Sequence, residues 1–129
     1  MKSYHELEVW QKSYGLALAI YKATSAFPKS EVFGLTSQVR RAAVSIPANI
    51  AEGHCRHTRA DFLRFLSIAQ GSAGELETLL SLARDLPYLN SEVAAQLLAQ
   101  LTEVGKMLTG LTQSLRNPRP ESGPLAPSP

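Results

Sequence analysis

Apolar residues recur at steps of three and four positions over four long stretches of this chain, and a proline or glycine lies in or close to each break between the stretches. The stretches span residues 4–26, 34–56, 58–86 and 91–116. Steps of three and four place side chains on one face of an α-helix, so each stretch predicts an amphipathic helix. No alternating pattern with an Asn-Gly or Asp-Gly turn competes with them. The sequence predicts an all-α protein.

Typical helix-capping residues precede three of the stretches. Ser3 with Glu6 predicts a capping box for the first helix, Thr58 with Asp61 caps the third, and Asn90 caps the fourth. These signals predict where the helices begin.

Two features are unusual inside helices. Pro47 lacks an N–H and clashes with the carbonyl of Ala43, which predicts either a kink near Pro47 or a break into two shorter helices. Gly71 and Gly74 lie in the middle of the third stretch, where each costs about 1 kcal/mol relative to alanine. We expect close approach of another helix to compensate for this cost.

The first stretch carries two apolar sets, and a helix that is apolar on more than one side needs more than one neighbour. The predicted core stripe is Leu7, Trp10, Tyr14, Leu18 and Tyr21. The second set, left for another contact, is Val9, Leu16 and Ile20.

Short connections between four amphipathic helices predict an antiparallel up-down four-helix bundle over residues 1–116. An open helical array completed by neighbouring subunits is the alternative. Residues 117–129 contain five prolines and predict a flexible tail.

Composition favours a cytoplasmic protein without a membrane span. The single cysteine excludes an internal disulfide and fits a reducing compartment. No apolar run reaches the roughly 20 residues of a membrane helix, and residues 1–6 lack the apolar stretch of a signal peptide.

The net charge of +2 does not by itself indicate a nucleic-acid-binding protein. Arginine is nevertheless concentrated in one region that holds only two carboxylates, Glu52 and Asp61. Such an excess can bind phosphate, or the arginines can form salt bridges within or between subunits. The candidate arginines are Arg40, Arg41, Arg56, Arg59 and Arg64.

A second set of polar residues lies on the second and third helices. Arg41, Ser45 and Asn49 are spaced by four residues and share one helix face. The set predicts either a hydrogen-bond network that fixes helix register or a recognition surface. Its members besides Arg41 are Ser45, Asn49, Glu52, Glu75 and Glu77.

No arrangement typical of catalysis stands out. The chain has no Glu-x-x-His pair for a di-iron site and no phosphate-binding glycine loop. His54, Cys55 and His57 form the only metal-like cluster, and no second cluster could complete a zinc site within one chain. We therefore predict no catalytic residues, metal or cofactor, and a metal-dependent enzyme is the least favoured hypothesis.

Several blocks of the sequence resemble a known four-helix-bundle family, that of proteins encoded in 23S rRNA intervening sequences. Leu7-Glu8-Val9-Trp10-Gln11-Lys12 resembles the start of its first helix. Residues 34–53, GLTSQVRRAAVSIPANIAEG, are similar to its central signature, and residues 65–72 with Glu75-Leu76-Glu77 to its third helix. In Leu86-Pro87-Tyr88-Leu89 the proline replaces a more usual glycine.

The resemblance covers about residues 4–115 and implies a homopentamer of four-helix bundles without enzyme activity. It leaves the function of most members unknown. More distant similarity extends to accessory proteins of diversity-generating retroelements, whose basic pentamers engage reverse transcriptase and nucleic acid.

Two function hypotheses follow. The first is a non-enzymatic oligomer that binds RNA or a nucleic-acid-associated protein through its arginines. The second is a protein-interaction adaptor without nucleic acid, motivated by the spare apolar set of the first helix and by the tail.

Overall fold

The computed structural model describes residues 3–117, and the predicted tail lies outside this part except for Asn117. All regular structure in the described part is helical. Two 3-10 helices accompany four long helices: η1 (Tyr4–Glu6), α1 (Glu8–Thr24), η2 (Lys29–Glu31), α2 (Leu35–His54), α3 (Arg59–Asp85) and α4 (Ser91–Arg116). The predicted all-α class with four helices is confirmed.

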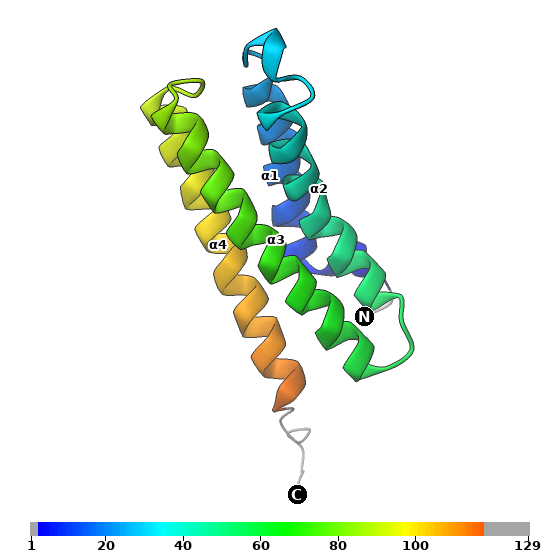
Figure 1. Cartoon of the computed structure of the whole chain (residues 1–129). Helices are drawn as coiled ribbons and strands as arrows, with labels where there is room; N and C mark the ends of the chain where they lie inside the picture. The colour runs from blue at the N-terminus through cyan, green and yellow to red at the C-terminus, as the bar shows by residue number, and fades with distance from the viewer. Residues whose placement is uncertain (1–2, 118–129) are drawn as a thin grey trace, which may run out of the picture.

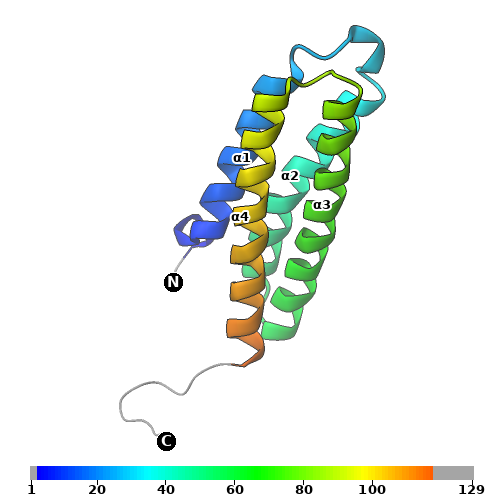
Figure 2. The ribbon, with the colours of Figure 1, turned by 90° about the vertical axis from the view of Figure 1, so that its left-hand side faces the viewer.

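The four long helices lie side by side (Figures 1 and 2). Each helix contacts the next one along the chain, and α4 also contacts α1. The α1–α2 and α3–α4 connections lie at one end of the molecule, and the α2–α3 connection lies at the other (Figure 1). The core therefore runs lengthwise between the four helices.

The first helix is shorter than predicted. Ser3 accepts a hydrogen bond from the backbone N–H of His5 and caps η1 rather than α1. Leu7 then adopts an extended conformation (φ −74°, ψ 123°) with its side chain buried, and α1 begins at Glu8. Ser3 and Glu6 therefore do not cap α1 as predicted. Instead, α1 begins directly after the buried residue Leu7.

The second helix is continuous through Pro47, so the predicted alternative of a break into two helices is wrong. Ile46 and Ile50 are completely buried on either side of the proline, and Pro47 is itself buried. Core contacts on both sides outweigh the loss of one helical hydrogen bond.

The core-facing side of α1 differs from the predicted one. Val9, Leu16 and Ile20 are buried, whereas Tyr14, Leu18 and Tyr21 are 48%, 52% and 45% exposed. Both sets have helical spacing, so periodicity identifies two apolar faces without showing which one the other helices cover. The prediction failed only in part, because Leu7 is buried and Trp10 packs against the core.

Apolar side chains at helical spacing form the core of α2, α3 and α4. In α2, Val39, Ala43, Ile46 and Ile50 are at most 1% exposed. In α3 and α4 the completely buried leucines are Leu66, Leu76, Leu80 and Leu108. All of these side chains belong to one core cluster.

The glycines of α3 do not have the predicted role. A Cβ at Gly71 or Gly74 would meet nothing within 4 Å in the described structure, so no helix of this chain approaches them closely. The close approach occurs at Gly53 instead, where a Cβ would lie 2.8 Å from Cβ of Phe65 and 3.0 Å from Cδ1 of Phe62. Gly53 therefore allows the end of α2 to pack on the start of α3.

A side-chain hydrogen bond joins the two connections at the opposite end. The Tyr88 hydroxyl, between α3 and α4, donates to Oε2 of Glu31 at 3.1 Å. The other carboxylate oxygen of Glu31 accepts from the backbone N–H of Leu35 at 3.0 Å, at the start of α2. The hydrogen bond to Glu31, with lesser contributions from burial and the carboxylate charge, raises the pKa of Tyr88.

Gly53→Ala should lower the free energy of unfolding by about 1–3 kcal/mol, because the added methyl group overlaps Phe62 and Phe65. Gly71→Ala is the matched control and should leave stability unchanged or raise it by up to about 1 kcal/mol. Urea unfolding at one protein concentration measures both. Equal stability of the two variants would contradict the packing seen at Gly53.

Stability should decline at alkaline pH in a way that depends on Tyr88. An unfolded tyrosine loses its proton near pH 10, whereas the raised pKa of Tyr88 keeps the folded phenol protonated to higher pH. The contribution of this residue is therefore complete below about pH 10 and is lost as pH rises through the folded pKa. In urea titrations across this range the stability of Tyr88→Phe should decline less steeply than that of the wild type, and equal slopes would contradict the role of Tyr88.

Candidate nucleic-acid interface

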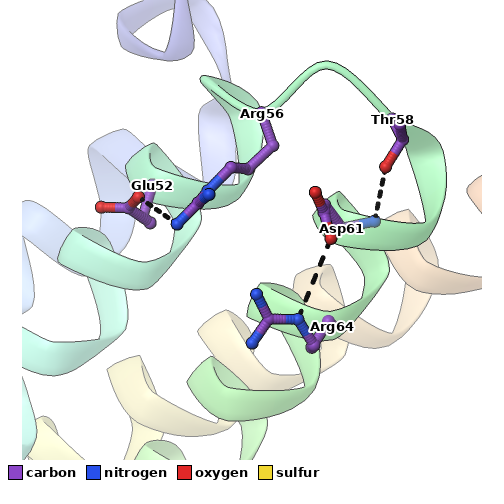
Figure 3. Close-up of polar contacts among 5 residues, drawn as sticks. All are labelled: Glu52, Arg56, Thr58, Asp61 and Arg64. Atoms are coloured by element: carbon purple, nitrogen blue, oxygen red, sulfur yellow. Dashed lines mark hydrogen bonds and ion pairs between the residues drawn. The ribbon is translucent and has the colours of Figure 1, made fainter.

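The turn between α2 and α3 carries three of the five candidate arginines. The α2 helix ends at His54, and Thr58 caps α3 by accepting a hydrogen bond from the backbone N–H of Asp61 at 3.1 Å, as predicted (Figure 3). Arg56 lies in the turn, Arg59 is the first residue of α3, and Arg64 lies about one turn further on. We call these three residues the arginine turn.

Two residues of the arginine turn are held over one aromatic ring. The guanidinium carbons of Arg56 and Arg64 lie 4.9 and 4.5 Å from the ring centre of Phe65. Arg56 also pairs with Glu52 at 2.9 Å, and Arg64 lies 4.0 Å from Asp61 (Figure 3). The cation–π contacts and ion pairs position both guanidinium groups at the surface.

The arginine turn keeps a surplus of positive charge. Its three arginines face two carboxylates, those of Glu52 and Asp61, and Arg59 makes no ion pair within residues 3–117. Each guanidinium has five N–H donors, and a single ion pair uses only some of them. The turn can therefore donate hydrogen bonds to phosphate oxygens.

Arg40 and Arg41 are not part of this group. The Nε of Arg40 donates to the Thr24 hydroxyl at 2.8 Å, its Nη2 donates to the Tyr21 carbonyl at 3.2 Å, and its guanidinium lies 4.5 Å from the Tyr21 ring centre. Arg40 thus joins α2 to α1. Arg41 is exposed on α2. From Arg40 to the end of α2 at His54 is fourteen residues, about 21 Å along the helix axis, and Arg56 lies beyond that end.

Part of the predicted polar set forms a hydrogen-bonded group between α2 and α3. The Ser45 and Ser72 hydroxyl oxygens are 2.7 Å apart, and the Asn49 side-chain amide donates to the Ser45 hydroxyl at 2.9 Å and to the Ser45 carbonyl at 2.8 Å. Sequence reasoning missed Ser72, because a serine among small residues of α3 gives no signal until its partner is known.

The glutamates of that set lie elsewhere. Glu52 belongs to the arginine turn through its ion pair with Arg56. Glu75 and Glu77 are exposed on α3, and neither forms an ion pair within the described residues. The structure therefore brings Ser45 and Asn49 together and leaves the three glutamates apart from them.

The histidine and cysteine cluster is dispersed around the same turn. His54 packs edge-on against the Phe62 ring, with 5.7 Å between ring centres, and Cys55 and His57 are exposed. Within residues 3–117 no group of three or more His, Cys, Asp or Glu side chains is placed to hold a metal ion.

The second distinctive surface is apolar. Tyr14, Leu18 and Tyr21 of α1 lie exposed beside Val44 of α2, which is 42% exposed. We call these four residues the α1–α2 face. With Ala17 and Pro47 they line a shallow groove of about 300 Å³, the α1–α2 groove. The sequence shows the helical spacing of Tyr14, Leu18 and Tyr21, but the sequence-based prediction placed these residues in the core.

Fold and surfaces together define a four-helix all-α protein with an arginine-bearing turn and an exposed apolar face. A model of the family described as 23S rRNA-intervening sequence protein matches residues 5–110. The chain therefore belongs to this family, as the sequence blocks predicted.

A solved structure supports the assignment. It is that of a protein of unknown function from the S23 ribosomal protein family of Bacteroides thetaiotaomicron, which is 31% identical to this chain. The match has a TM-score of 0.74 and covers 81% of this chain and 98% of the other. No curated protein matches this chain. None of the helices in residues 3–117 is both long and apolar enough to cross a membrane.

Proposed function

We propose that this protein is a non-enzymatic homo-oligomer, a pentamer of antiparallel bundles with α2 bent at Pro47, whose arginine turns bind RNA. The proposed self-assembly rests on the exposure of the α1–α2 face. The proposal places the protein in the cytoplasm and assigns it no cofactor.

The α1–α2 face has the size and chemistry of an interface centre. Its two tyrosines, each about half exposed, present roughly 200 Å² of surface, and Leu18 and Val44 add to it. Contiguous apolar patches of a few hundred Å² mark interaction sites on soluble proteins. Tyrosine is also enriched in interface centres, where its ring is buried and its hydroxyl finds a partner.

A protein adaptor is the second candidate, and the same face supports it. The sequence-based reason for an adaptor was the spare set Val9, Leu16 and Ile20, which the core of the chain itself buries. The exposed residues of the α1–α2 face now supply the reason to consider an adaptor. We favour a second copy as the partner because family resemblance also implies self-assembly.

Leu18→Asp should convert the oligomer into monomers, because it places a charge at the centre of the α1–α2 face. Leu18 is 52% exposed, so the monomer should remain folded by circular dichroism. Ile68→Asp, at a 42% exposed position of α3, is the matched control and should keep the wild-type mass in light scattering. A wild-type monomer would contradict self-assembly and leave the adaptor as the explanation of the face.

RNA binding rests on the arginine turn. One copy offers a surplus of about one positive charge there, which is weak for a nucleic-acid site. Repetition of the turn around the axis of an oligomer would multiply the positive field. The guanidinium groups are held over Phe65 and keep free donors, so binding requires little further ordering.

Combined Arg56→Ala and Arg59→Ala substitution should weaken binding of a labelled RNA hairpin by roughly tenfold or more, measured by fluorescence anisotropy. Wild-type affinity should also fall between about 50 and 200 mM salt, because bound phosphates release counterions. Arg84→Ala, at the far end of α3, is the control and should bind like the wild type. Absence of binding at low salt, or equal losses in all variants, would remove the RNA part of the proposal.

A further inference from the structure

Phe33 is the most exposed large apolar side chain in the described structure. It is 96% exposed and so touches almost nothing in its own chain. It lies in the connection between α1 and α2, which projects beyond the end of the bundle (Figures 1 and 2). The neighbouring Val32 is also half exposed.

The segment that carries Phe33 is held by hydrogen bonds on both sides. The backbone N–H of Val32 donates to the Lys29 carbonyl at 3.2 Å, and that of Gly34 donates to the Glu31 carbonyl at 2.9 Å. The Glu31 carboxylate in turn accepts from Leu35 and Tyr88. A fixed loop loses little conformational entropy when its exposed ring binds, which favours a contact residue.

The α1–α2 groove is the hollow whose chemistry suits this ring. Every residue that lines it is apolar or tyrosine, as described above. The larger hollow between α3 and α4 includes Gln70, Glu77 and Lys106. The hollow beside the α1–α2 connection includes Lys29 and Arg40. A cavity of about 150 Å³ can hold a benzene ring, so a groove of about 300 Å³ has room for a phenyl group.

We propose that Phe33 of one copy inserts into the α1–α2 groove of the next copy. The inference rests on the proposed self-assembly and specifies the residues that make it. Val44 lies nine residues into α2 from Leu35, about 14 Å along the axis, so a chain does not fill the middle of its own groove with its own Phe33.

Apolar area exposed on both sides of the contact supports a second copy as the occupant. Phe33 on one copy, and Tyr14 with Tyr21 on the other, expose roughly 200 Å² per copy, about a quarter of the 800 Å² that each partner buries in a standard interface. Val32, Leu18 and Val44 extend this surface. Because the ring and the groove are different surfaces, the contact is head-to-tail, and repeated head-to-tail contacts can close a ring with an odd number of subunits.

Phe33→Ser should raise the dissociation constant of the oligomer by about tenfold or more, as expected for a buried aromatic contact residue. Sedimentation over a range of concentrations measures this shift. The substitution removes a side chain that contacts almost nothing in the monomer, so circular dichroism should be unchanged. Ile68→Ser is the matched control and should assemble like the wild type.

A photocrosslink identifies the groove directly. Benzoylphenylalanine in place of Phe33 keeps an aromatic ring, and assembly of isotopically heavy and light chains distinguishes crosslinks between chains from those within one chain. Mass spectrometry should locate the crosslink between residue 33 of one copy and residues 14–21 or 44–47 of another.

The outcomes separate this inference from the proposal on which it rests. If the wild type assembles and Leu18→Asp dissociates it, but Phe33→Ser does not and the crosslink maps elsewhere, the Phe33 contact is wrong and self-assembly stands. If the wild type is a monomer, both the Phe33 contact and the proposed self-assembly are wrong. An isolated crosslink to α3 or α4 of a second copy would also overturn the Phe33 contact.

Discussion

Burial of one apolar face of α1 against α2 and α4 is the contact on which the rest of the structure depends. Ile20 is completely buried and Leu16 nearly so, and they pack in the same cluster as core leucines and isoleucines of α2, α3 and α4. Each such side chain contributes about 1.5–3 kcal/mol by leaving water. One helix can turn only one face to this core, so the second apolar face of α1 stays exposed.

The two ends of the bundle are built in different ways. At the α2–α3 end, Gly53 allows the backbone of α2 to approach Phe62 and Phe65 of α3. Thr58 caps the start of α3 at the same end. The same Phe65 that packs near Gly53 supports two arginines on its ring. The structural packing of this end and its positive surface therefore share one residue.

At the opposite end, Glu31 joins the two connections by accepting from Tyr88 and from the start of α2. This arrangement holds the α1–α2 connection in place while Phe33 points away from its own chain. Apolar contact surface thus lies on α1, α2 and the loop between them, and positive charge gathers at the other end of α2. The two proposed activities, self-assembly and RNA binding, use separate parts of the chain.

The sequence by itself determined the helical class, the number of long helices, the caps at Thr58 and Asn90 and the family, because these depend on local spacing and on contiguous motifs. Tertiary structure alone decided which face of α1 is buried, since two stripes with the same helical period are equivalent until neighbours are placed. It also decided that Ser72 reaches Ser45, that Arg40 bonds to α1 rather than joining the arginine turn, and that Gly53 rather than Gly71 or Gly74 lies against a neighbour. Each of these depends on distances between helices, which the order of residues along one helix does not contain.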